Sequence, residues 1–308
     1  MKNPLLLTQF LTMSWALMPE RLQAMHAILS RWSSGGDLSD EAKHRIQTER
    51  VLRDSRRHLM NTVSNDGIAV LPLYGVLTQR GNMVDDVSGS GCSSTQQFTL
   101  ALRNALEDES VKQILIDIDS PGGSVYGIAE LAAEIIQART QKPIVAIANS
   151  LAASAAYWIA CCASEVYVTP GGEVGSIGVW QAHFDESEAL AVAGIKPTLI
   201  SAGKYKVEGN SYLPLDEEAH RFMQSRVDDY YADFTKAVAA GRNVSIAQVQ
   251  NGMGQGRVLG AEAALAQNMV DGIASFNEVI NKIRDRTSAQ RSSKINRLAQ
   301  AQRALSIA

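Results

Sequence analysis

Cysteine and histidine are scarce in this chain of 308 residues, which argues against metal and disulfide chemistry. The three cysteines, Cys92, Cys161 and Cys162, are too few for a disulfide framework and lack the spacing of zinc ligands. With a net charge of −3, the chain also lacks the basic excess that is typical of nucleic-acid-binding proteins. We therefore expect no metal, no cofactor and no nucleic-acid partner.

Long apolar runs are also missing, although 45% of the residues are hydrophobic. The N-terminal residues 1–22 come nearest to such a run, but Thr8, Gln9 and Thr12 interrupt it and no Ala-x-Ala-like cleavage site follows. The stretch is too short and too polar to span a bilayer, and it departs from the pattern of a secretory signal. We expect a cytoplasmic protein that is neither secreted nor anchored in a membrane.

Shifts in composition divide the chain into three parts. Apolar residues at helical spacing after Pro19, then a Ser/Gly-rich turn and a charged helical stretch, predict a helical extension over residues 1–62. The main domain is predicted over residues 63–283. Residues 284–308 contain six Lys or Arg and one Asp, which predicts a basic tail that is either solvated or binds a partner.

The main domain alternates apolar strands with amphipathic helices. A strand that ends in Pro-Gly-Gly occupies residues 111–124, and a helix, a strand, a helix and a short strand follow over residues 125–170. This alternation predicts parallel β-α-β units and an α/β fold. Farther along, the pattern predicts a helix at 186–193, a strand at 196–201 and a long helix at 217–240.

Ser154 lies between a predicted strand and a helix-like run of small residues. Taken alone, this stretch favours a packed helix, but a serine at a strand-to-helix turn can also expose its hydroxyl as a nucleophile. The Pro-Gly-Gly turn ends a neighbouring parallel strand, so both loops should meet at one edge of the sheet. The backbone N–H groups of Gly122 or Gly123 and of Ala155 could then bind an oxyanion beside Ser154.

A serine hydroxyl needs a neighbouring base before it can attack. Of the five histidines, only His183 lies near a predicted strand after the serine, and Lys204 and Lys206 lie in the polar loop that follows the strand predicted at 196–201. A buried lysine can act as a base because desolvation leaves part of its amine neutral. The residues by themselves leave these three candidates open.

Four motifs occur in a fixed order, DIDSPGGSVYG, NSLAASAAYWIA, GEVGSIGV and SAGKYK, at residues 117–127, 149–160, 172–179 and 201–206. Together they resemble the signal peptide peptidase A family of serine peptidases, and the resemblance covers residues 67–274. It implies the ClpP/crotonase fold of repeated β-α-β units. It also implies ring-like homo-oligomers in which neighbouring subunits bring cleft residues together.

The resemblance implies a role for each motif. Ser154 would be the nucleophile, and Lys206, which closes the G-x-x-K block, would be the general base. Ser176 of the G-S-I-G block would hold the lysine amine in position, and Gly123 and Ala155 would supply the oxyanion donors. The chain departs from the family where many members have glycines after the serine. We expect Ala155-Ala156 to keep the backbone donor but to narrow the cleft.

The helical extension, the basic tail and the single peptidase unit resemble the phage and prophage branch of the family, whose members resemble head maturation proteases. This resemblance implies an endopeptidase that processes scaffold, portal or capsid protein in the host cytoplasm or an assembling prohead. Three other interpretations stay open: degradation of peptides as by a bacterial signal peptide peptidase, a crotonase-type acyl-CoA enzyme, and an assembly protein without catalytic activity.

Overall fold

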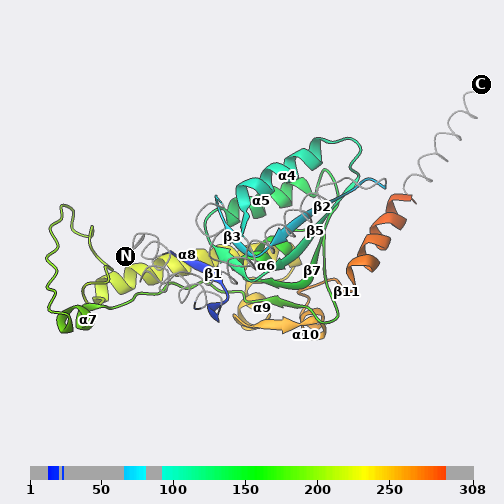
Figure 1. The fold of residues 1–308 in the computed structure, drawn as a ribbon. Helices are drawn as coiled ribbons and strands as arrows, with labels where there is room; N and C mark the ends of the chain where they lie inside the picture. The colour runs from blue at the N-terminus through cyan, green and yellow to red at the C-terminus, as the bar shows by residue number, and fades with distance from the viewer. Residues whose placement is uncertain (1–12, 21–22, 24–65, 81–91, 289–308) are drawn as a thin grey trace, which may run out of the picture.

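The computed structural model describes residues 13–20, 23, 66–80 and 92–288 of the chain (Figure 1). Nearly all of the helical extension expected over residues 1–62, and the tail beyond residue 288, lie outside these ranges. The described residues form a mixed α/β fold in which most strand pairs of the larger sheet are parallel. Within them, no helix combines the length and the apolar character needed to cross a membrane.

The elements follow the predicted alternation. The strands are β1 (Trp15–Leu17), β2 (Ile68–Tyr74), β3 (Val76–Thr78), β4 (Cys92–Ser94), β5 (Gln113–Ser120), β6 (Gly122–Ser124), β7 (Ile144–Ala153), β8 (Glu165–Val168), β9 (Glu173–Gly175), β10 (Val258–Gly260) and β11 (Gly272–Ile273). The helices are α4 (Thr95–Glu107), α5 (Ile128–Ala138), α6 (Ala155–Ala160), α7 (Ser187–Val192), α8 (Glu217–Arg242), α9 (Ile246–Asn251) and α10 (Ala261–Ala266).

The larger sheet carries the core. Its strand order is β10-β9-β7-β5-β2, with β8 beside β7 and β11 beside β8. Successive side chains of β5 point to opposite faces, so Ile114 and Ile116 pack in one apolar cluster with α4 and α5, whereas Leu115 packs in a second. Because both faces are covered, β5 is almost continuously buried, as is typical of parallel strands.

A smaller sheet has the order β1-β6-β3-β4. The Pro-Gly-Gly turn after β5 does not simply reverse the chain, because Gly122 and Gly123 continue into β6. Strand β6 is parallel to β3 on one side and antiparallel to β1 on the other. The smaller sheet thus brings the N-terminal strand β1 against residues more than a hundred positions away in the sequence.

Residues 181–216 form an arm that extends away from the two sheets, with α7 near its far end (Figure 1). The strand predicted at residues 196–201 is wrong, because the described structure has no strand there. Ile200 is 94% exposed, and no described strand pairs with this stretch. The helix predicted at 186–193 and the long helix predicted at 217–240 are confirmed as α7 and α8.

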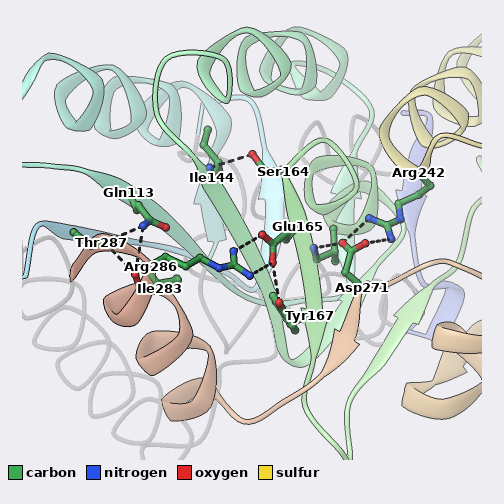
Figure 2. Close-up of polar contacts among 11 residues, drawn as sticks. Gln113, Ile144, Ser164, Glu165, Tyr167, Arg242, Asp271, Ile283, Arg286 and Thr287 are labelled. Carbon is green, nitrogen blue, oxygen red and sulfur yellow. Dashed lines mark hydrogen bonds and ion pairs between the residues drawn. The ribbon is translucent and has the colours of Figure 1, made fainter. Parts of the chain in front are cut away.

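A final helix over residues 276–288 packs on the second face of the larger sheet. Val279 and Ile283 are buried there, and Gln113 of β5 donates a hydrogen bond of 2.8 Å to Thr287 (Figure 2). Arg286 forms an ion pair with Glu165 of β8, as Figure 2 also shows. Residues 284–288, which the sequence placed in the basic tail, therefore belong to a helix that contacts the sheet.

A second ion pair, between Arg242 and Asp271, joins the end of α8 to the residue before β11 (Figure 2). Both guanidinium–carboxylate distances are 2.9 Å, and the Val166 N–H donates to the same carboxylate at 2.7 Å. Burial opposes the charged form of Asp271, but the bonds from Arg242 and Val166 outweigh it and lower the pKa of this carboxyl. The ionised pair therefore stabilises the fold.

Replacing Asp271 by Asn should lower the free energy of unfolding by about 2 kcal/mol at pH 7, because the charge-assisted bonds are lost and Arg242 stays largely buried. The wild-type advantage should shrink as the pH falls below about 4. The pKa of Asp271 is lower in the folded chain than in the unfolded chain, so its carboxylate stabilises the fold above the unfolded pKa and loses this effect as it becomes protonated. Urea unfolding at several pH values measures this. The matched control is Asp229→Asn in the exposed Arg226–Asp229 pair, which should cost less than about 0.5 kcal/mol; equal losses would contradict the prediction.

Candidate active site

Ser154 occupies the turn between β7 and α6 in a backbone conformation that few residues adopt. Its φ is 55° and its ψ is −121°, and such strain persists only where the surroundings enforce it. The Ser154 N–H donates to the Gly175 carbonyl at 2.7 Å, and its carbonyl accepts from the Trp158 N–H at 3.0 Å. The residue is 1% exposed, so strand, helix and the neighbouring strand β9 together fix its position.

The Pro-Gly-Gly turn lies directly beside Ser154. A Cβ placed on Gly122 would lie 2.9 Å from the Cβ of Ser154 and 2.2 Å from the carbonyl oxygen of Ala16. A Cβ on Gly123 would lie only 1.9 Å from the carbonyl oxygen of Leu77. The two loops predicted to meet at one sheet edge therefore do so, and only residues without side chains allow the approach.

The G-S-I-G block forms a second border of the site. Ser176 follows β9 with a φ of 54°, is 8% exposed, and donates its N–H to the Arg257 carbonyl at 2.8 Å. Two residues later, the Gly178 carbonyl accepts a long hydrogen bond of 3.5 Å from the Ser154 hydroxyl. The structure thus brings Ser154 and the residues on both sides of Ser176 into contact.

Backbone donors are available around the serine. Ala155 is the first residue of α6, and the N–H groups of a first helical turn have no partner within the helix. Gly123 belongs to β6, immediately after the turn that contacts Ser154. Among the described residues, no group of His, Cys, Asp and Glu is arranged to hold a metal ion. The arrangement therefore offers a hydroxyl and backbone N–H groups, the requirements of acyl transfer.

The three candidate bases all lie in the arm. Lys204 donates to the Tyr205 hydroxyl at 2.7 Å and to Glu218 at 3.1 Å, and these bonds raise the pKa of Lys204 and keep it charged. His183 contacts the Asn210 carbonyl through Nε2 at 3.0 Å. Lys206 is exposed, and no hydrogen bond between described residues joins it to Ser154. Within the described part of the single chain, none of these three candidate bases is hydrogen-bonded to the serine.

Strand β1 also borders the site, and the sequence pattern did not predict it. Trp15, Ala16 and Leu17 are each no more than 1% exposed. The segment was assigned to a helical extension, whereas it is a short strand beside the turn that contacts Ser154. The four consecutive apolar residues before Pro19 are the available signal, and they do not identify a distant partner strand.

Comparison with known proteins identifies relatives of this chain. The profile of Peptidase family S49 matches residues 136–290, which include Ser154, Ser176 and Lys206. The chain is 34% identical to "Capsid assembly protease C" of Escherichia phage lambda, over 74% of this chain and 51% of that protein. It is 37% identical to "Head-tail preconnector protein GP5" of Enterobacteria phage P21, over 67% of this chain and 41% of that protein.

A cellular relative is more distant. The chain is 27% identical to "Putative signal peptide peptidase SppA" of Enterococcus faecium, over 72% of this chain and 64% of that protein. The chain spans about half the length of the phage relatives that it matches. What those relatives share with this chain is therefore a region and not their whole length.

Gly123→Ala should lower the free energy of unfolding by about 2 kcal/mol, because its methyl group would overlap the backbone of Leu77 and force β3 and β6 apart. Gly171→Ala is the matched control, since a Cβ there has nothing within 4 Å and should change stability by less than about 0.5 kcal/mol. Urea unfolding of the three proteins gives the comparison. A Gly123→Ala protein as stable as the control would show that the two strands do not approach as described.

Proposed function

The chain belongs to peptidase family S49, and from this membership we propose that it is a serine endopeptidase that processes proteins of an assembling phage capsid. The main support for peptidase chemistry is that Ser154 is buried, has a strained backbone and lies beside the two glycines of the Pro-Gly-Gly turn. The two phage relatives, one of them named a capsid assembly protease, support a role in phage capsid assembly. Scaffold, portal or capsid proteins in a host cell or prohead are the proposed substrates.

In this proposal, Ser154 attacks the carbonyl carbon of a peptide bond. The hydroxyl lies at the start of α6, where its position is fixed by backbone bonds to Gly175 and Trp158. The N–H groups of Gly123 and Ala155 would bind the oxyanion, and both belong to segments that flank the serine. Preorganised donors of this kind stabilise the charge that develops in the transition state. No cofactor is needed for the reaction.

Lys206 is the proposed base, with Ser176 holding its amine. Lys204 is a poor alternative, because its bonds to Tyr205 and Glu218 raise its pKa and favour the charged form. His183 is held by the Asn210 carbonyl within the arm. Lys206 closes the G-x-x-K block that the family resemblance assigns to the base.

We further propose that Lys206 reaches the serine of a second copy of the chain. The arm that carries Lys206 extends away from the sheets that hold Ser154 (Figure 1). Exposed large apolar side chains of the described residues gather on the arm and the start of α8, where eight of twelve lie: Phe184, Val192, Ile195, Ile200, Tyr205, Tyr212, Leu213 and Phe222. Such a surface is typical of a protein interface, so a homo-oligomer that buries the arm would complete each site.

The parallel core and the turn beside Ser154 support the ClpP/crotonase fold. A peptidase that degrades free peptides would use the same site, and the cellular relative favours that alternative. A crotonase-type acyl-CoA enzyme would use the backbone donors without requiring Ser154, and an assembly protein would use neither.

Ser154→Ala tests the nucleophile. The variant should fold like the wild type, because Ala keeps the Cβ and the hydroxyl makes only one long hydrogen bond. Hydrolysis of a denatured protein substrate should fall by up to about a million-fold, as is found when a serine nucleophile is removed. Peptide release and labelling by a fluorophosphonate probe measure it. Near-native turnover in Ser154→Ala would exclude a serine peptidase of this type.

Mixing two inactive variants tests the source of the base. Ser154→Ala and Lys206→Ala should each be inactive, but their mixture should regain activity, because a mixed interface would combine Ser154 of one copy with Lys206 of another. Lys204→Ala, which removes the neighbouring amine, should stay active and is the matched control. Initial rates before and after mixing decide the matter. An active Lys206→Ala variant would reject this base, and an inactive mixture of inactive variants would place the base within one chain.

A further inference from the structure

Residues 14–18 lie along the candidate site as an extended segment whose backbone is bound on both sides. On one side, β1 is antiparallel to β6, with Ala16 opposite Gly123 and Leu17 opposite Gly122. On the other side, Trp15 exchanges two backbone hydrogen bonds with Trp180, at 2.9 and 3.0 Å. An extended peptide held between two backbone edges is the arrangement by which strand addition binds peptides.

The carbonyl of Ala16 is the part of this segment that comes to Ser154. The Ala16 oxygen and the Ser154 Cβ both lie next to the point that a Gly122 side chain would occupy, at 2.2 and 2.9 Å from it. These two atoms are therefore neighbours across a glycine. No other carbonyl of β1 is among the atoms closest to that point.

The register of the ladder points the same carbonyl at an oxyanion donor. The Val125 N–H donates to the Ser14 carbonyl at 3.5 Å, and the Met18 N–H donates to the Pro121 carbonyl at 3.2 Å. Hydrogen-bonded pairs recur every two residues in an antiparallel ladder, so Ala16 and Gly123 form the pair between them. The N–H of Gly123 is the donor that the proposed function assigns to the oxyanion.

We propose that residues 14–18 occupy the substrate groove as the protein's own first substrate, and that the peptide bond between Ala16 and Leu17 is cleaved. The inference rests on the proposed function of Ser154. The segment shows the mode by which other substrates bind: extended, antiparallel to β6, with a small residue before the bond that breaks. While it stays in place, residues 14–18 also exclude other peptides from the groove.

The proposed cleavage is an acyl transfer to Ser154 followed by hydrolysis. The Ser154 oxygen forms a bond to the carbonyl carbon of Ala16 and gives its proton to the neutral amine of the base. The C–N bond to Leu17 then breaks, and the Leu17 nitrogen takes that proton and leaves as a free amine. Water hydrolyses the Ala16 ester, which restores the Ser154 hydroxyl and leaves a carboxylate on Ala16. No oxidant or cofactor takes part.

Ala16 has features expected of a residue before the cleaved bond. Its side chain is small and 0% exposed, so the space around it is filled. Trp15 and Leu17, on either side, are each 1% exposed, and the Trp180 indole N–H donates to the Leu17 carbonyl at 2.9 Å. A bulky residue at position 16 should therefore not fit, whereas Ser should.

The experiment follows the N-terminus of the full-length protein during incubation, by intact mass and N-terminal sequencing. The wild type should lose residues 1–16 and begin at Leu17, whereas Ser154→Ala should stay intact. Ala16→Ser should still be cut, and Ala16→Phe should be cut about a hundredfold more slowly. A synthetic peptide TMSWALMPE, matching residues 12–20, should be cut by the wild type at the same Ala–Leu bond, and its Phe-substituted form should resist.

The outcomes separate this inference from the proposed function. If the full chain hydrolyses a denatured protein in a Ser154-dependent way but leaves the Ala16–Leu17 bond intact in both chain and peptide, the inference is wrong and the peptidase assignment stands. Cleavage at another bond of residues 14–18 would also reject the register. If Ser154 supports no hydrolysis and does not react with a fluorophosphonate, both the self-cleavage inference and the peptidase assignment are wrong. The peptide pair needs no altered protein, so a misfolded Ala16→Phe chain would not obscure the result.

Discussion

The absence of side chains at Gly122 and Gly123 is the constraint on which the site depends. Atoms of β1, β3 and the start of α6 converge on these two positions, and a single methyl group at either would overlap a backbone oxygen. A larger residue would move the turn away from Ser154 and the Gly123 N–H away from a bound carbonyl. The same constraint explains why a peptide backbone can pass so close to the serine, since no side chain of the turn stands between them.

Much of the fold could be predicted because its core depends on local patterns. Buried strands and amphipathic helices differ in their hydrophobic period, and β5, α5, β7 and α6 follow from it. The strand expected at residues 196–201 failed because a strand needs a neighbouring backbone edge, and the described residues offer this stretch no strand partner. The basic composition after residue 283 concealed a helix whose partner for Arg286 is Glu165, far away in the sequence.

The site could be predicted only as far as topology dictates it. Neighbouring parallel strands end at one edge, which was enough to bring the Pro-Gly-Gly turn to Ser154. The preference for Lys206 over Lys204 needed the family resemblance first, and the hydrogen bonds of Lys204 now add a physical reason. Strand β1 could not be predicted, because it pairs with β6, which joins residues 15–17 to residues 122–124. Three apolar residues in a row do not indicate which distant strand they will pair with.

Two parts of the chain would then control one serine, and they would act in opposite directions. Residues 14–18 lie beside Ser154 in the isolated chain, and the arm that carries the proposed base extends away from the sheets. Under the proposed function, a chain that has not met a second copy has its own strand bound and no amine at Ser154. Association would supply the lysine while β1 still lies on the serine, so the first bond within reach is Ala16–Leu17. Cutting in this order would couple the opening of the groove to assembly, because an arm-mediated interface forms only as the concentration of copies rises. A peptidase that is confined with its own copies in a growing shell would thus become active there before it does in dilute solution.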